Sequence, residues 1–132
     1  MAFVPGRIVN VDVKFLLDTG SSVSIIHPHT FELLPLSCRH TVTPSDKTII
    51  AAEGTKMQVQ GTLQVVIKLG ALVKRHTVYI APITQAGILG LDFLTLHQGV
   101  LDLHRKRLMF EGAVKSRSYL RISRQLVVVE CF

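Results

Sequence analysis

Short apolar runs separated by Gly, Pro, Asn and Asp follow one another along most of the chain. Residues 7–13 and 62–69 alternate between apolar and polar side chains, and residues 73–81 form a further strand that Pro82 ends. A period of two is typical of strands that bury one face, whereas helices repeat every three to four residues. This pattern predicts an all-β fold.

A hairpin and one helix are predicted within this β pattern. Residues 48–52 and 57–61 are extended segments on either side of a turn that contains Gly54, which favours a β-hairpin. Leu91 to His97 has apolar side chains at positions 91, 93, 94 and 96, the spacing of the only convincing helix. Residues 29–34 predict no more than a helical turn.

Length and composition fit one soluble domain. The chain has 132 residues, of which 48% are hydrophobic, so it is long enough to bury a core. No apolar run reaches the roughly 18–20 residues that cross a bilayer, and the first residues lack the pattern of a signal peptide. Two cysteines, Cys38 and Cys131, are too few for a disulfide framework. We expect an intracellular protein, in the cytoplasm or in a virus-like particle, with no membrane partner.

Positive charge gathers toward the end of the chain, which has a formal net charge of +6. Residues 100–103 and 107–110 predict a terminal hairpin, so we place a folded domain at 1–112. Residues 113–132 are then a basic C-terminal extension, either a linker or an added edge strand. A basic segment of this kind is more often a solvated surface than a nucleic-acid site, so no nucleic acid is expected as a partner. The basic residues in the last quarter are Arg105, Lys106, Arg107, Lys115, Arg117, Arg121 and Arg124.

One Asp-Thr-Gly tripeptide, at residues 18–20, gives the strongest chemical signal in the chain. It follows the apolar run Phe15-Leu16-Leu17 and precedes Ser21 and Ser22. A carboxylate at the end of a rigid strand and before a glycine turn is held firmly yet faces outward, as an acid or base catalyst requires.

The context of this tripeptide resembles that of the retropepsins, the dimeric aspartic proteases of retroviruses and LTR retroelements. Residues 16–22 resemble their catalytic loop, and Gly87-Ile88-Leu89-Gly90-Leu91-Asp92-Phe93-Leu94 resembles their second hallmark segment. The hairpin at 48–61 lies between the two, where the family carries its flap. The resemblance covers about residues 6–112 and implies a retropepsin-like fold with a flap hairpin and one short helix.

The resemblance also implies a mechanism. Peptide hydrolysis by carboxylates needs one group to take a proton from water and another to give a proton to the carbonyl oxygen. Two aspartates about 3 Å apart cannot both ionise, so they share one proton and supply both functions. This chain has one such motif, which implies a homodimer with Asp18 from each protomer. The implied activity is an aspartic endopeptidase that cleaves extended hydrophobic sites, with polyprotein processing of a retroelement as its role and no metal or cofactor.

Further residues receive roles from the same resemblance. Thr19 would hydrogen-bond to the partner's loop, and Gly20 would hold substrate backbone. The hydroxyl of Ser21 would bind the aspartate and favour its ionised form, which implies an acidic working range. The substrate-binding candidates are Ser21, Val23, Ile50, Ala51, Ala52, Glu53, Gly54, Ile83 and Ile88.

Other interpretations remain for these residues. The rival to a protease is a retropepsin-like dimerisation or protein-binding module with little or no proteolysis. Asp92 is expected to cap or salt-bridge the predicted helix, with a nearby Arg as partner. His27, His29, Cys38 and His40 have a spacing that fits no common zinc site, so no metal is expected.

Overall fold

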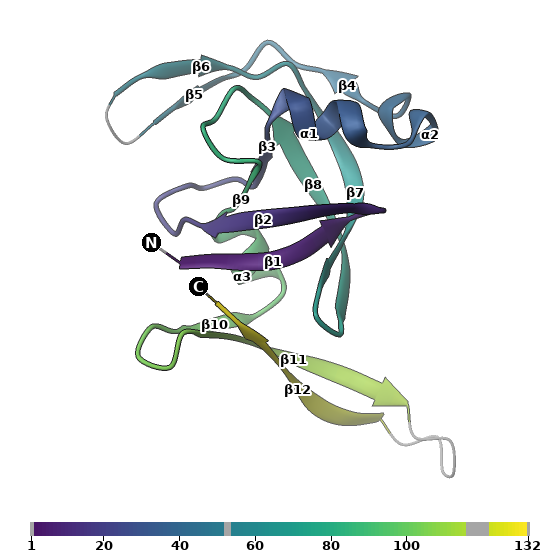
Figure 1. Ribbon diagram of the computed structural model, residues 1–132, viewed down its shortest axis with the longest axis vertical. Helices are drawn as coiled ribbons and strands as arrows, with labels where there is room; N and C mark the ends of the chain where they lie inside the picture. The colour runs from purple at the N-terminus through teal and green to yellow at the C-terminus, as the bar shows by residue number, and fades with distance from the viewer. Residues whose placement is uncertain (1, 52–53, 116–121, 132) are drawn as a thin grey trace.

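Twelve strands and three short helices follow one another across the residues that the computed structural model describes, 2–51, 54–115 and 122–131 (Figure 1). The elements in chain order are β1 (Ala2–Ile8), β2 (Val11–Leu17), β3 (Ile25–Ile26), α1 (Pro28–Leu33), α2 (Leu36–Arg39), β4 (Thr43–Pro44), β5 (Thr48–Ile50), β6 (Lys56–Gln58), β7 (Gly61–Leu69), β8 (Leu72–Ile80), β9 (Gly87–Leu89), α3 (Leu91–Leu96), β10 (Gly99–Asp102), β11 (Arg107–Lys115) and β12 (Ile122–Glu130).

The main sheet closes on itself. Its strand order is β1-β2-β9-β3-β8-β7-β4, and β1 also pairs with β7, where Ile8 lies opposite Ile67. This second pairing joins six of the described strands into a ring, with β4 attached outside it. Closure pairs the strand edges that an open sheet would expose. The architecture confirms the predicted all-β, barrel-like fold.

The long hairpin β7–β8 confirms the period-two prediction. Its register runs from Gly61 opposite Ile80 to Leu69 opposite Leu72. Every second residue of β7 is buried, because successive side chains of a strand point to opposite faces. The alternation at 62–69 therefore predicted both the element type and the buried face of β7, and the strand predicted at 73–81 corresponds to β8.

The N-terminal strands differ from the prediction. Alternation across residues 7–13 indicated one strand, but the chain turns at Val9 and Asn10 and forms the hairpin β1–β2. Val9 has a φ of 57°, and its N–H donates to the carbonyl of Val66 at 2.9 Å. Valine rarely occupies the left-handed region, so a valine at this position does not predict the two-residue turn that forms here. The prediction of one continuous strand is wrong.

The described residues form three short helices, where the sequence predicted one convincing helix and one helical turn. α3 begins at Leu91 as predicted, and α1 covers most of the predicted turn. α2 was not predicted, because it has only four residues and follows Pro35 directly. None of the described helices is long and apolar enough to cross a bilayer.

A separate three-stranded sheet, β10-β11-β12, lies at the opposite end of the molecule from the hairpin β5–β6 (Figure 1). The pairing of β10 with β11 confirms the predicted terminal hairpin. Within the segment that we assigned to a linker or an edge strand, the backbone of residues 122–130 forms β12. It pairs with β11 from Arg107 opposite Glu130 to Lys115 opposite Ile122.

Two apolar clusters pack against opposite faces of β2. Phe15 and Leu17 belong to the larger cluster, which fills the barrel. Leu16 points the other way and belongs to a smaller cluster, as expected for neighbouring residues of a strand. The smaller cluster consists of Leu16, Ile25, Ala81, Ile83 and Ile88. Because both faces of β2 are buried, the loop that follows it begins from a firmly held strand end.

Candidate active site

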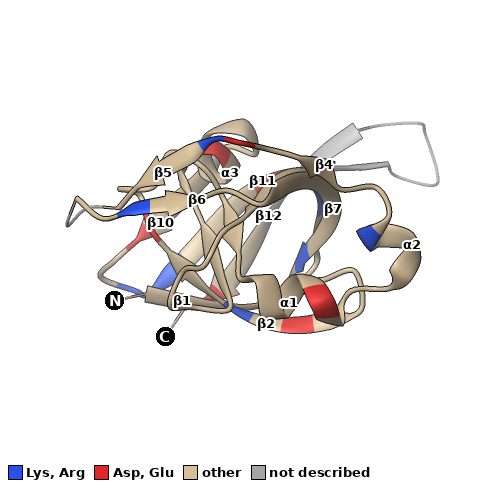
Figure 2. Ribbon diagram, turned by 90° about the horizontal axis from the view of Figure 1, so that it is seen from above, with Lys and Arg blue, Asp and Glu red and all other residues tan. Residues whose placement is uncertain are grey.

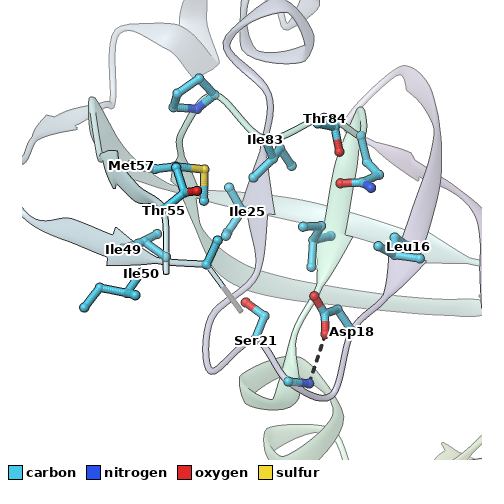
Figure 3. A pocket seen from close by; sticks show the side chains of 15 residues that line it. Leu16, Asp18, Ser21, Ile25, Ile49, Ile50, Thr55, Met57, Ile83 and Thr84 are labelled. Carbon is cyan, nitrogen blue, oxygen red and sulfur yellow. Dashed lines mark hydrogen bonds between the residues drawn. The ribbon is translucent and has the colours of Figure 1, made fainter. Parts of the chain in front are cut away.

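Asp18 begins the loop between β2 and β3, and the neighbouring strand fixes its backbone. β2 and β9 run parallel with Leu17 opposite Leu89, and the N–H of Asp18 donates to the Leu89 carbonyl at 3.1 Å. Inside the loop, the N–H of Gly20 donates to Asp18 Oδ1 at 3.0 Å. The N–H of Ser21 donates to the Asp18 carbonyl at 3.1 Å. These bonds orient the Asp18 carboxyl group, which points into a cavity (Figure 3).

The cavity has a volume of about 410 Å³ and lies between the loop that starts at Asp18, the hairpin β5–β6 and the 82–85 segment. This volume is within the range of pockets that hold small ligands or a few side chains of a peptide. Asp18 is the only charged side chain among the described residues that line it. The lining consists of Leu16, Asp18, Gly20, Ser21, Ile25, Ile49, Ile50, Ala51, Thr55, Met57, Pro82, Ile83, Thr84, Gln85 and Ile88.

The cavity brings together many of the residues that the sequence predicted. Thr19 and Gly54 are exposed and do not line it, and Val23 is half-buried against the smaller apolar cluster. Ala52 and Glu53 lie outside the described residues. The predicted site residues in the lining are Asp18, Gly20, Ser21, Ile50, Ala51, Ile83 and Ile88, and Thr55, at the end of the predicted flap turn, lines it as well.

Sequence reasoning missed part of the lining. Leu16 was predicted only as part of the segment that carries Asp18, and Ile25 was not predicted as a site residue, although both belong to the smaller cluster under the cavity. In the 82–85 segment only Ile83 was predicted as a site residue, yet the whole segment supplies one wall. A signal was present there, since Thr84 and Gln85 interrupt an otherwise apolar stretch. The missed lining residues are Leu16, Ile25, Ile49, Met57, Pro82, Thr84 and Gln85.

The structure corrects the expected role of Ser21. Its hydroxyl was expected to bind Asp18, but Ser21 Oγ donates to the carbonyl of Val23 at 2.7 Å. A hydroxyl has one hydrogen to donate, so this bond braces the loop internally. The expectation of an acidic working range loses this support.

Gly90 allows the second hallmark segment to lie directly against the loop. A Cβ at this position would be 2.3 Å from the carbonyl oxygen of Val23 and 2.8 Å from that of Ser21. The next residue, Leu91, donates its N–H to the Ser21 carbonyl at 2.8 Å. This close approach holds the second half of the loop in place, and a side chain at residue 90 would prevent it.

The hydrogen-bond partners of Asp92 differ from the predicted arginine. Its expected Arg partner is replaced by Ser24, whose Oγ donates to Oδ1 at 2.8 Å, and by His76, whose Nε2 lies 2.9 Å from Oδ2. Burial by itself would raise the pKa of Asp92. The hydrogen bonds from His76 and Ser24 outweigh burial and hold this pKa below its ordinary value.

Charges on the described elements are dispersed. Figure 2 shows the Lys and Arg positions and the Asp and Glu positions spread over several strands and helices. In the part of the chain that the structure describes, no three His, Cys, Asp or Glu side chains come together in an arrangement that could hold a metal ion.

Known proteins resemble this chain both in sequence and in three-dimensional structure. The family model described as "gag-polyprotein putative aspartyl protease" matches residues 4–96, which include Asp18 and the whole of α3. The retroviral protease-like domain of Ddi1 from Leishmania major is similar with a TM-score of 0.68 and 23% identity, over 95% of this chain and 94% of that chain. EIAV protease, solved with the inhibitor HBY-793, is similar with a TM-score of 0.62 and 21% identity, over 76% of this chain and 91% of that chain. At these identities the structural likeness shows a common fold.

Proposed function

This chain belongs to the gag-polyprotein aspartyl protease family, and from that premise we propose that it is an aspartic endopeptidase that works as a homodimer. It hydrolyses peptide bonds in extended, apolar segments. The observation that carries the proposal is the orientation of Asp18, whose carboxyl group points into a cavity with mostly apolar walls (Figure 3). Apolar walls favour apolar substrate side chains, and the carboxyl group is available for acid–base chemistry.

The need for a second copy follows from the chemistry. One carboxyl group cannot act at once as the base that activates water and as the acid that protonates the carbonyl oxygen. No other acidic side chain lines the described part of the cavity. A two-fold axis beside the loop would bring a second Asp18 next to the first, and the pair would share one proton. The pair then titrates as a unit.

The β10-β11-β12 sheet is the proposed dimer surface. Val100 on β10, Leu103 in the following turn and Val128 on β12 are 58%, 73% and 44% exposed. Gathered apolar side chains of this kind mark interaction surfaces. β10 follows α3, and α3 begins at Leu91, which is bonded to the loop. A partner on this sheet therefore approaches the loop that carries Asp18.

The remaining roles complete the proposed site. Thr19, exposed beside Asp18, would hydrogen-bond to the partner's loop, and Gly20 would leave room for substrate backbone. The hairpin β5–β6 would cover an extended peptide, which binds as an added strand through its main chain. Within the hairpin, Ile50 and Ala51 would contact substrate side chains.

The natural substrate that we propose is a retroelement polyprotein, processed inside the cell or in a virus-like particle. The cysteines support a reducing compartment, because neither Cys38 nor Cys131 is bridged.

Cleavage of a diverse peptide mixture by the wild type and by Asp18→Asn tests the proposal. We expect the wild type to cut, pepstatin to inhibit it, Asp18→Asn to be inactive, and specific activity to fall on dilution as the dimer dissociates. Cleavage by both proteins would contradict the role of Asp18. A folded dimer that cuts nothing would favour the alternative, a dimerisation or protein-binding module.

A further inference from the structure

Asp92 and His76 form a polar network outside the cavity lining, behind the loop that carries Asp18. The Asp92 carboxyl group has four hydrogen-bond partners. Oδ1 accepts from Ser24 Oγ at 2.8 Å and from the N–H of Phe93 at 2.7 Å. Oδ2 accepts from the N–H of Ser24 at 3.1 Å and lies 2.9 Å from Nε2 of His76. His76 is only 5% exposed, so the histidine side of this contact is shielded from water.

Ser24 links this network to the loop. It is the last residue of the loop, directly before β3, and its Oγ also accepts the N–H of Gly90 at 3.0 Å. Gly90 in turn lies against the Val23 carbonyl. Ser24 is therefore bonded to both Asp92 and Gly90. The position of the loop end depends on where Asp92 is held.

His76 is the buried group that holds Asp92 from the barrel side. An ionised carboxylate only accepts hydrogen bonds, and three of the four partners of Asp92 are fixed N–H or O–H donors. The fourth, His76 Nε2, therefore carries the proton. In the neutral ring Nδ1 is then an acceptor, and His97 Nε2 lies 3.2 Å from it. Phe93 packs edge-on to His76 at a ring distance of 5.0 Å, which fixes the ring orientation.

We propose that His76 and Asp92 are positioning residues for catalysis, which act through Ser24 to fix the loop that carries Asp18. This inference rests on the proposed function. Neither residue lines the cavity, so substrate affinity should not depend on them directly. Catalytic groups must be held within about 0.5 Å of their working geometry, so loss of the network lowers the rate of the chemical step.

Three variants remove the network at successive points. His76→Leu removes the donor to Asp92, whereas His76→Gln keeps an N–H at a similar place. Asp92→Asn places an amide nitrogen, which cannot accept, opposite either Ser24 or His76. Ser24→Ala removes the hydroxyl that joins Gly90 to Asp92.

We expect His76→Leu, Asp92→Asn and Ser24→Ala to lower kcat by roughly tenfold to a hundredfold and to change KM by no more than about twofold. His76→Gln should recover part of the lost rate.

Two controls separate positioning from general destabilisation. Thr77→Ala changes an exposed neighbour on β8, and Ile67→Val weakens the barrel core away from the network. Both controls should keep the wild-type kcat below their unfolding temperatures.

Amide hydrogen exchange tests the same inference without any cleavage, in the inactive Asp18→Asn background. His76→Leu should speed exchange at Ser21, Ser24 and Gly90 and leave β7 amides unchanged. An unchanged loop would overturn the inference, as would a loss of kcat that Ile67→Val reproduces at equal stability. If the wild type cleaves no peptide, the proposed function fails, and the exchange result still decides whether the network fixes the loop.

Discussion

The two walls of the cavity are built in opposite ways. On one side, the loop that carries Asp18 is bonded to β9 and to the start of α3, and its last residue, the buried Ser24, is bonded to Asp92 and Gly90. On the other side, β5 and β6 have three residues each and form a two-stranded sheet of their own. Ile50 in this hairpin is 67% exposed.

This difference assigns different tasks to the two walls. A segment with many buried contacts opens rarely, whereas an exposed two-stranded hairpin opens at little cost. The fixed wall keeps the carboxyl group in one geometry, and the hairpin is suited to move when an extended peptide enters or leaves. We expect substitutions in the fixed wall to change stability and rate, and those in the hairpin to change substrate affinity.

The largest contrast should come from two glycines. Gly90→Ala places a methyl group 2.3 Å from the Val23 carbonyl oxygen, so we expect a loss of about 3 kcal/mol in unfolding free energy or more, with near-complete loss of activity. Gly54→Ala meets no atom within 4 Å but must adopt a φ of +87°, which should cost about 1–2 kcal/mol. Urea unfolding and peptide cleavage measure both effects. Equal losses in the two variants would contradict the distinction between the walls.

Two isoleucines that line the same cavity give the next contrast. Ile25 is 2% exposed, so Ile25→Ala should lower the unfolding free energy by about 2–5 kcal/mol. Ile50 is 67% exposed, so Ile50→Ala should change stability by less than about 0.5 kcal/mol. Its effect should be a higher KM, because the side chain would cover the substrate. If Ile50→Ala proved the more destabilising, the hairpin would be a packed part of the core.

The smallest effect is a pH dependence of stability, which comes from His97 and Asp92 behind the fixed wall. Burial, together with the nearby positive charge of Lys74, lowers the pKa of His97 from 6.5. Below pH 6.5 the unfolded chain therefore takes up a proton that the folded chain resists, so stability falls as pH falls. The pKa of Asp92 is also lowered, from 3.8, so its contribution is present above pH 3.8 and is lost as pH falls through the folded pKa.

Denaturant titrations at several pH values between 5 and 7 would measure the His97 contribution. His97→Gln should reduce the slope of unfolding free energy against pH. His40→Gln, a change at an exposed histidine, should leave this slope as in the wild type. Identical slopes in all three proteins would show that His97 does not contribute.

Local patterns predicted much of this molecule. Alternation predicted β7, because one face of this strand is buried and the other is not, and the strand-like run at 73–81 predicted β8. The resemblance of residues 16–22 and 48–61 to retropepsin segments implied that the loop carrying Asp18 and the hairpin β5–β6 share one site. These signals depend on neighbouring residues, and a single sequence contains them.

The remaining features depend on contacts between distant residues. Ser24 and Asp92 are 68 positions apart, and no local pattern indicates that they meet. The wall at Pro82 to Gln85 has no regular period, and the turn at Val9 places valine in a conformation that it rarely adopts. In each case the local structure follows from contacts made in the closed barrel and not from local propensity.

The central claim, one active site built from two copies of Asp18, is tested by mixing. A fixed amount of wild type is allowed to exchange subunits with increasing Asp18→Asn, with mixed dimers confirmed by native mass spectrometry, and peptide cleavage is then measured. Because each mixed dimer lacks one carboxyl group, activity should fall to about half at equal amounts and toward zero in excess of the variant. Activity that stays constant while mixed dimers accumulate would contradict the shared site.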